Sequence, residues 1–199
     1  MIQDSPQAFI FFGRSGSGKG TQAKLLIKYL EENTQRKVLY IETGERFREF
    51  KVGESFSSKL TKEVMEHGGL MPEFLPVWIW SDFLIKNFTG DEHLVLDGLS
   101  RRVDEAPVLA SALEFYKFNN PVVIHMNVSR ERAFEMLKGR GRKDDTDEYI
   151  NKRLDWFETK VMPSIEYFKD HSGYVFLDIN GGGSIEEVHK ELIEKISKI

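Results

Sequence analysis

Short apolar runs recur along the chain, and turn-forming or charged residues bound each of them. Five of these runs read as strands, at residues 8–12, 38–41, 94–96, 122–126 and 174–177. A segment with the period of a helix follows each run, and strands that are apolar on both faces are typical of a parallel sheet covered by helices. The pattern therefore predicts an α/β fold, in which a five-stranded parallel sheet lies between two layers of helices.

Helical periodicity also locates the elements between the strands. Helices are predicted over residues 22–32, 72–88, 130–138 and 146–169. The second of them carries an aromatic run of Trp78, Trp80, Phe83 and Phe88, whose spacing predicts a helix packed against the sheet. Because ligands of such folds bind at the carboxyl ends of the strands, we expect the functional residues there.

Two stretches depart from this alternation. Residues 42–71 lie between the second strand and the helix at 72–88, and they read as short helices broken by Gly53 and Gly68. Residues 139–146 form a short connection that is rich in glycine and charge. The sequence contains no internal repeat or linker, so the whole chain, 1–199, is expected to be a single domain with these two excursions.

Composition narrows the class of function. With 28 Lys and Arg against 32 Asp and Glu, the net charge is −4, which argues against a nucleic-acid-binding surface and requires any polyanion site to be a local cluster of cations. The absence of cysteine excludes disulfides, thiolate metal sites and thiol nucleophiles. The first residues lack a signal pattern, and no apolar run approaches the length of a membrane span. We therefore expect a cytoplasmic protein that does not bind membranes.

The stretch from Gly13 to Thr21 follows the first strand and opens the first helix. Its small residues let successive backbone N–H groups point at one phosphate, the helix N-terminus adds partial positive charge, and Lys19 can reach the β- and γ-oxygens. These features predict a phosphate-binding loop, and a glycine-rich turn that binds no phosphate is the alternative. The candidate contacts are Gly16, Ser17, Gly18, Lys19, Gly20 and Thr21.

The metal ligand of this loop is displaced by one position. A hydroxyl normally follows the lysine and contacts Mg²⁺, but here Gly20 stands in that place and Thr21 comes next. The metal must therefore be held differently. Asp97 ends the third strand, where a phosphotransferase holds an acid that binds magnesium directly or through water. The alternative is an acid that only caps the following turn.

Further motifs follow the phosphate loop in a fixed order. The form GSGKGTQ at 16–22 is similar to that of nucleoside monophosphate kinases, and after it come T-G-x-x-x-R at 43–48, D-G-x-x-R at 97–101, R-x-D-D at 142–145, K-R-L at 152–154 and N-x-x-G-S at 180–184. Over nearly its whole length the chain thus resembles the adenylate kinases with a short lid. The resemblance implies a P-loop NTPase three-layer sandwich, with 42–71 binding the acceptor nucleotide and 139–146 as the lid. It also implies reversible, Mg-dependent transfer of the γ-phosphoryl group of ATP to AMP, giving two ADP.

The resemblance assigns roles to individual residues. Roughly five or six negative charges meet in one cleft during this reaction, so fixed cations are needed. The implied catalytic residues are Lys19, Arg101, Arg140, Arg142 and Arg153. Arg140 and Gly183 join the phosphate loop as implied contacts of ATP. Those implied for AMP are Thr43, Gly44, Arg48, Val64, Gly69, Leu70, Met71, Gly98, Arg101, Glu105, Arg142 and Arg153. Asp144 and Asp145 either orient the lid arginines or, with Thr146, cap the next helix.

The chain departs from the family pattern near the acceptor. Leu99 and Ser100 stand where the family has Phe and Pro, and Glu105 stands where the family has a Gln that reads adenine. A Gln amide accepts from adenine N6 and donates to N1, whereas an ionised Glu only accepts and suits the donors of guanine. Thr43 and the rest of the acceptor segment follow the adenylate pattern. AMP is therefore the expected acceptor, and the alternatives are GMP and then UMP or CMP.

Two other classes of function are weighed against this reading. A kinase for a non-nucleotide molecule would keep the phosphate loop but lack the set of Thr43, Arg48 and Arg101, and a silent nucleotide-binding protein would lack Lys19 or the lid arginines. The five histidines have no ligand-like spacing, so the expected cofactor is Mg²⁺ with ATP, without zinc. The expected partners are ATP, AMP and ADP, with no nucleic acid, and the protein is expected to be a monomer.

Overall fold

The computed structural model of the chain describes residues 5–141 and 145–199 and contains a sheet of five parallel strands. They are β1 (Ala8–Gly13), β2 (Val38–Glu42), β3 (His93–Asp97), β4 (Val122–Asn127) and β5 (Val175–Asn180), in the order β2-β3-β1-β4-β5. All five predicted strands are confirmed. Each continues past its predicted end, because the backbone pairing extends into the polar residues that follow the apolar run, as in the pair Glu42 and Asp97.

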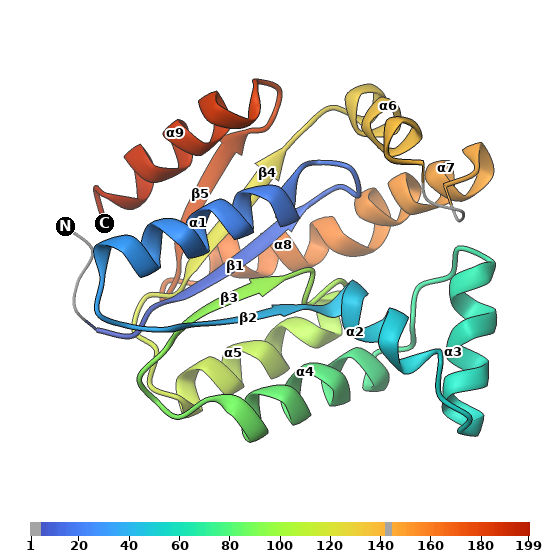
Figure 1. Cartoon of the computed structure of the whole chain (residues 1–199), viewed down its shortest axis with the longest axis horizontal. Helices are drawn as coiled ribbons and strands as arrows, with labels where there is room; N and C mark the ends of the chain where they lie inside the picture. The colour runs from blue at the N-terminus through green and yellow to red at the C-terminus, as the bar shows by residue number, and fades with distance from the viewer. Residues whose placement is uncertain (1–4, 142–144) are drawn as a thin grey trace.

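Helices cover both faces of this sheet (Figure 1). They are α1 (Lys19–Asn33), α4 (Phe74–Asn87), α5 (Ala106–Phe115), α8 (Met162–Asp170) and α9 (Ile185–Ile196). Ile10 and Phe12 of β1 belong to the core formed with α4, α5 and α8, whereas Phe9 and Phe11 belong to the core formed with α1 and α9. The sheet is thus the middle layer of the three-layer α/β sandwich expected from the sequence.

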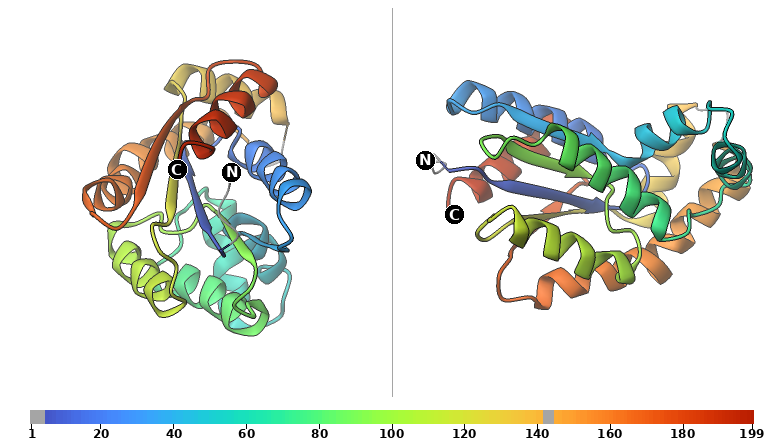
Figure 2. Two further views of the ribbon diagram at one scale, coloured as in Figure 1. Left: turned by 90° about the vertical axis from the view of Figure 1, so that its left-hand side faces the viewer. Right: turned by 90° about the horizontal axis from the view of Figure 1, so that it is seen from below.

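Two pairs of helices extend beyond the carboxyl ends of the strands, at the opposite end of the molecule from the C-terminus (Figures 1 and 2). One pair is α2 (Thr43–Phe50) and α3 (Phe56–Glu66), and the other is α6 (Arg130–Arg140) and α7 (Asp147–Trp156). The first pair fills the predicted excursion. Between them lies the carboxyl end of β1, which has β3 on one side and β4 on the other. This is the switch point at which open α/β sheets bind ligands.

The long helix predicted over 146–169 is divided in the structure. α7 is followed by a π turn, η2 (Phe157–Val161), and then by α8. Pro163 has no N–H to donate to the carbonyl of residue 159, so one α-helical bond is missing, and the N–H of Met162 instead bonds the carbonyl oxygen of Phe157. Before the turn the helix packs against α6, and after it the helix packs on the sheet.

The aromatic run of α4 is only partly buried. Trp80 is 1% exposed and belongs to the core, as predicted, but Trp78 is 49% exposed. The prediction that Trp78 packs against the sheet is wrong, because its face of α4 turns toward α2, where its ring contacts that of Phe50 with 5.4 Å between the centroids. Neither α4 nor any other helix in the described part of the chain is long and apolar enough to cross a membrane.

Candidate active site

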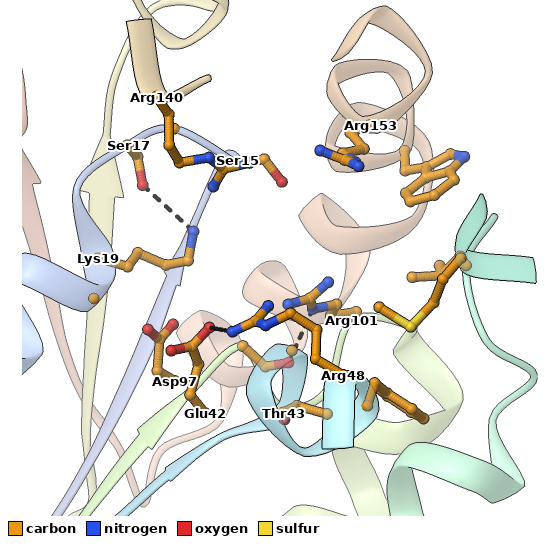
Figure 3. A pocket seen from close by; sticks show the side chains of 18 of the residues that line it. Ser15, Ser17, Lys19, Glu42, Thr43, Arg48, Asp97, Arg101, Arg140 and Arg153 are labelled. Atoms are coloured by element: carbon orange, nitrogen blue, oxygen red, sulfur yellow. Dashed lines mark hydrogen bonds and ion pairs between the residues drawn. The ribbon is translucent and has the colours of Figure 1, made fainter. Parts of the chain in front are cut away.

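A cleft of about 790 Å³ opens at the carboxyl ends of β1, β2 and β3 (Figure 3). The phosphate loop, α2, residues 68–71, the turn after β3, and the facing ends of α6 and α7 line it. The predicted site residues found at this cleft are Gly16, Ser17, Gly18, Lys19, Gly20, Thr21, Thr43, Gly44, Arg48, Gly69, Leu70, Met71, Asp97, Gly98, Arg101, Glu105, Arg140 and Arg153. The fold thus gathers segments that are far apart in sequence at one site.

Three predicted site residues are not among them. Arg142 lies outside the described residues. Val64 packs behind Gly69, since a Cβ added to Gly69 would lie 2.6 Å from Cγ1 of Val64. Gly183 follows β5, and its carbonyl oxygen accepts a hydrogen bond of 3.4 Å from Nη2 of Arg132. Within the described part of the chain, neither Val64 nor Gly183 lines the cleft, so the roles implied for them stay predictions.

Glycines determine the shape of the phosphate loop. Gly16 and Gly18 have φ angles of +83° and +84°, in the left-handed region that residues with side chains rarely adopt. A Cβ at Gly16 would also lie 2.5 Å from the carbonyl oxygen of Ala133 in α6. Helix α1 starts at Lys19, and Gly18 has no side chain with which to cap it. This arrangement leaves the first N–H groups of a helix to a phosphate.

Lys19 lies in the mouth of this loop. Its Nζ donates hydrogen bonds of 2.8 Å to the carbonyl oxygens of Gly13 and Arg14, and Oγ of Ser17 lies 3.5 Å away. Burial lowers the pKa of the Lys19 amine to about 8, although the negative charge of Asp97 acts in the opposite direction. A phosphate bound here would favour the charged amine and raise this pKa again. The loop therefore holds a cation where the β- and γ-phosphates of a nucleotide would lie.

Asp97 ends β3 beside the phosphate loop. Asp97 is 5% exposed, its Oδ2 lies 3.5 Å from the hydroxyl of Tyr40, and burial raises the pKa of its carboxyl despite the attraction of Lys19. A Cβ at Gly20 would lie 3.5 Å from this Oδ2, so the glycine after the lysine lets α1 begin close to the carboxylate. A buried carboxylate of this kind gains from a nearby cation, and Mg²⁺ commonly binds one or two carboxylates together with substrate phosphates.

No cluster of three carboxylate, imidazole or thiolate side chains that could hold a metal ion occurs among residues 5–141 and 145–199. A magnesium ion at Asp97 would take further ligands from the phosphates of a nucleotide. This arrangement fits an ion that arrives with ATP.

Two arginines face the loop from the side of the cleft that α2 and the turn after β3 form. Nη2 of Arg48 lies 3.1 Å from Oε1 of Glu42, and Nε of Arg101 donates a hydrogen bond of 3.0 Å to the carbonyl oxygen of Gly98. A Cβ at Gly44 would lie 3.3 Å from Nη1 of Arg48 and 3.8 Å from Nη2 of Arg101. Both guanidinium groups thus lie against Gly44 in the middle of the cleft (Figure 3), where one phosphate could bridge them.

The helices α6 and α7 bring two more arginines to the opposite wall. Asp145, whose side chain is 1% exposed, accepts hydrogen bonds of 3.0 and 2.8 Å from Arg140 and one of 2.7 Å from Arg153. Burial would raise the pKa of Asp145, but the bonds from both guanidinium groups lower it. Thr146 caps α7 through a 3.3 Å bond from the N–H of Tyr149. Asp145 therefore holds two arginines, as the first alternative predicts, whereas Thr146 and not an aspartate caps α7; Asp144 lies outside the described residues.

Apolar side chains line the same side of the cleft as these two arginines. They come from Phe47 of α2, Met65 of α3, Met71 and Pro76, and the backbone of residues 68–69 lies among them. Met71 is 6% exposed and also packs in a small core with Phe47. Such a wall suits the flat face of a nucleobase.

Sequence reasoning did not single out several residues of the site. Glu42 pairs with Arg48. Its position as a charged residue at the end of a strand, directly before the T-G motif, could have indicated it. Trp156 lines the cleft one helical turn after Arg153, and this spacing on one helix could have indicated it. Glu135 lines the cleft from α6, and no sequence motif marks it.

The arginines that face the phosphate loop across one cleft distinguish this site from one that only binds a nucleotide. They provide a second position for a phosphate, within the same cleft as the first, which is the requirement for transfer between two phosphorylated ligands. The fold and the site therefore define a P-loop phosphotransferase.

Comparison with known sequences specifies the family. Residues 11–173 match the family described as adenylate kinase. The chain is 30% identical over 188 residues to the adenylate kinase of a strain of Prochlorococcus marinus, covering 94% of this chain and 97% of that protein. It is 30% identical over 191 residues to that of Leptospira biflexa serovar Patoc (strain Patoc 1 / Ames), with coverage of 94% and 98%. It is 31% identical over 183 residues to adenylate kinase 1 of Nostoc sp. (strain PCC 7120), with coverage of 92% and 95%. The chain belongs to the adenylate kinase family.

Proposed function

We propose that the protein transfers the γ-phosphoryl group of ATP, bound with Mg²⁺, reversibly to AMP, giving two ADP. The observation that carries this proposal is the single cleft of about 790 Å³ with Lys19 on one side and Arg48 and Arg101 on the other. Two nucleotides bound there would present their phosphates to each other. The proposal includes a monomeric enzyme.

The donor phosphates belong at the phosphate loop. Lys19 would leave the carbonyl oxygens of Gly13 and Arg14 and bind the β- and γ-oxygens, and the N–H groups at the start of α1 would bind the β-phosphate. Mg²⁺, held through Asp97 directly or through water, would neutralise charge on the same phosphates. The buried position of Asp97 beside Gly20 supports this assignment.

The acceptor phosphate belongs between Arg48 and Arg101, and its base belongs against the apolar wall near Met71. Arg140 and Arg153, held by Asp145, would contact the transferred group from the opposite wall, and Arg142 of the same segment is proposed to join them. Catalysis then needs alignment and charge neutralisation, and it needs no side-chain nucleophile.

Closure of the cleft is part of the proposal. Residues 42–71 and 139–146 are the segments that we infer to move over the nucleotides, since 42–71 begins at the end of β2 and the helices α6 and α7, on either side of 139–146, line the cleft. Closure would exclude water, which otherwise competes with AMP for the phosphoryl group, and reopening could limit turnover.

The test is an assay with ATP and, separately, AMP, GMP, CMP and UMP. We expect AMP to be phosphorylated with the highest kcat/KM and two ADP to form for each ATP consumed. An inhibitor with two adenosines joined by five phosphates should bind far more tightly than ATP, because it spans both positions. Hydrolysis of ATP without transfer, or lack of inhibition by this compound, would contradict the proposal.

A further inference from the structure

One side chain on the acceptor side has no role in binding phosphate. Glu105, at the end of the 3₁₀ turn η1 (Val103–Glu105), is 2% exposed, and it lines the cleft. Its Oε2 is a buried atom that makes no hydrogen bond within the described residues, and Oγ1 of Thr43 is another at the same cleft. Buried polar atoms are rarely left unpaired, so two of them at a ligand site suggest that the ligand supplies the partners.

The surroundings indicate what kind of ligand group this is. Phe47, Met71 and Pro76 provide apolar contacts at this cleft, and the guanidinium groups of Arg48 and Arg101 also line it. A group that is flat and apolar on its faces, polar at its edge and linked to a phosphate fits this description. The base of a nucleoside monophosphate has all of these properties.

We propose that Glu105 reads the acceptor base as a neutral carboxylic acid, accepting a hydrogen bond from the 6-amino group of adenine through its carbonyl oxygen and donating its O–H to adenine N1. This inference rests on the proposed function and names the residue that selects the base. A neutral carboxylic acid has one donor and one acceptor, as a Gln amide does, whereas an ionised carboxylate has acceptors only. The ionised form would pair instead with the two donors of guanine, at N1 and N2.

The immediate surroundings of Glu105 favour its neutral form. Burial raises the pKa of its carboxyl to about 7, although the positive charges of Arg101 and Arg102, and hydrogen bonds from the backbone N–H groups of the same two residues, act in the opposite direction. Arg102 is already paired with Glu73, with Nη1 3.1 Å from Oε1. A bound acceptor phosphate would occupy Arg101 as well, which weakens the remaining attraction for a negative charge on Glu105.

The other charged groups around Glu105 do not reverse this effect. The helices packed against η1 are α5, whose charged residue is Glu114, and α8, which carries Glu166, Lys169 and Asp170 at positions that are exposed or half-buried. Across the cleft, Arg48 is paired with Glu42 and Arg153 with Asp145. The guanidinium groups that face the cleft from α2 and α7 thus already have carboxylate partners.

The experiment compares wild type with Glu105→Gln, in which the amide holds one donor and one acceptor at every pH. kcat/KM for AMP is measured from pH 5.5 to 8.5, and the ratio of wild type to variant is taken, which cancels the second ionisation of the AMP phosphate. We expect this ratio to be constant below about pH 6 and to fall about tenfold per pH unit above about pH 7.5. Asp104→Asn is the matched control, because it removes an exposed carboxylate from the same turn, and its ratio to wild type should not vary with pH.

GMP provides the second arm and needs no variant. The phosphate of GMP titrates as that of AMP does. The ratio of kcat/KM for AMP to that for GMP in wild type therefore reports on recognition of the base alone. GMP is measured as a substrate or as a competitive inhibitor. Adenine pairs with the neutral form of Glu105 and guanine with the ionised form. If the carboxyl has a pKa near 7, we expect this ratio to fall about a hundredfold from pH 6 to pH 8. The comparison of AMP with GMP tests the inference even if Glu105→Gln does not fold.

Three results would overturn the inference: a ratio of wild type to Glu105→Gln that does not change with pH, an equal fall in Asp104→Asn, or a constant ratio of AMP to GMP. Water rather than a base would then be the partner of Oε2. In each of these cases phosphoryl transfer to AMP continues, so the proposed function stands. A wild-type protein that phosphorylates no nucleoside monophosphate would instead contradict the proposed function itself.

Discussion

The phosphate loop on one side of the cleft is formed by backbone, whereas the acceptor side presents polar side chains. Gly16 and Gly18 set the path of the loop, and carbonyl oxygens of the loop accept hydrogen bonds from Lys19. Across the cleft, Thr43 and Glu105 carry buried oxygens that make no hydrogen bond within the described residues. The difference follows from the ligands. Every nucleoside triphosphate has the same phosphates, which backbone can bind, but the identity of an acceptor must be read by side chains.

The largest expected effect tests the loop side of this comparison. Lys19→Met removes the cation near the β- and γ-phosphates while keeping a long side chain, so kcat should fall on the order of a thousandfold. Steady-state rates measure the loss, and circular dichroism checks the fold. Lys28→Met, at an exposed position of the same helix, is the control. A Lys19→Met protein within threefold of wild type would exclude the proposed role.

The next effect concerns the stability of the acceptor side. The pKa of Glu105 is raised from 4.5 to about 7 in the folded protein, so the folded state keeps its proton while the unfolded state loses it. The contribution to the free energy of unfolding is therefore full below about pH 4.5, falls as pH rises and levels off above about pH 7. Relative to Glu105→Gln, the free energy of unfolding of wild type should fall by about 2–3 kcal/mol between pH 5 and pH 8. Urea unfolding of both proteins at pH 5 and pH 8 measures this change. If wild type and Glu105→Gln differ in free energy of unfolding by the same amount at both pH values, the carboxyl is not buried in solution.

A third prediction separates the two nucleotides. Arg48→Ala removes a charge-assisted contact to the acceptor phosphate, so KM for AMP should rise about 10- to 100-fold. KM for ATP should change by less than about twofold, because the phosphate loop does not depend on Arg48. Arg46→Ala is the control on the same helix, since Arg46 pairs with exposed Glu49 instead. Equal changes in both KM values would mean that the two sides of the cleft are not independent.

The smallest effect is expected at the wall that faces both ligands. Asp145→Asn replaces the charged acceptor that holds Arg140 and Arg153 with a neutral one. We expect kcat to fall about three- to tenfold, which corresponds to weakened charge-assisted hydrogen bonds rather than lost cations. Asp147→Asn, which breaks the nearby ion pair with Lys138, is the matched control. An unchanged kcat would show that the arginines need no such support.

The layers of the fold and most of the site could be predicted from the sequence. Buried parallel strands carry continuous apolar runs, which predict the sheet. Positions with positive φ usually carry glycine, so the glycines at 16 and 18 predict the loop. The resemblance to known kinases then supplied the arginines. These features share one property, which is that neighbours in the sequence determine them.

Packing between distant elements could not be predicted. Trp78 was expected in the core, but whether a residue on a nearly all-apolar helix faces the sheet or solvent depends on where α2 lies. Sequence also places Glu105 at a specificity position without revealing its burial, which is set by α5 and α8. The protonation state of Glu105, and hence the hydrogen bonds that it can make, depends on its tertiary surroundings.

The π turn η2 (Phe157–Val161) acts as a phase shift within one helix. A π turn accommodates an extra residue, and each residue of an α-helix advances the direction of side chains by roughly 100°. The inserted residue therefore lets α8 aim its apolar side at the sheet while α7 aims its own at α6. Without this offset, Arg153 and Trp156 would be rotated out of the cleft by about the same angle. A deletion of one residue within η2 would thus act like the loss of an arginine, although no side chain that contacts nucleotide had been changed.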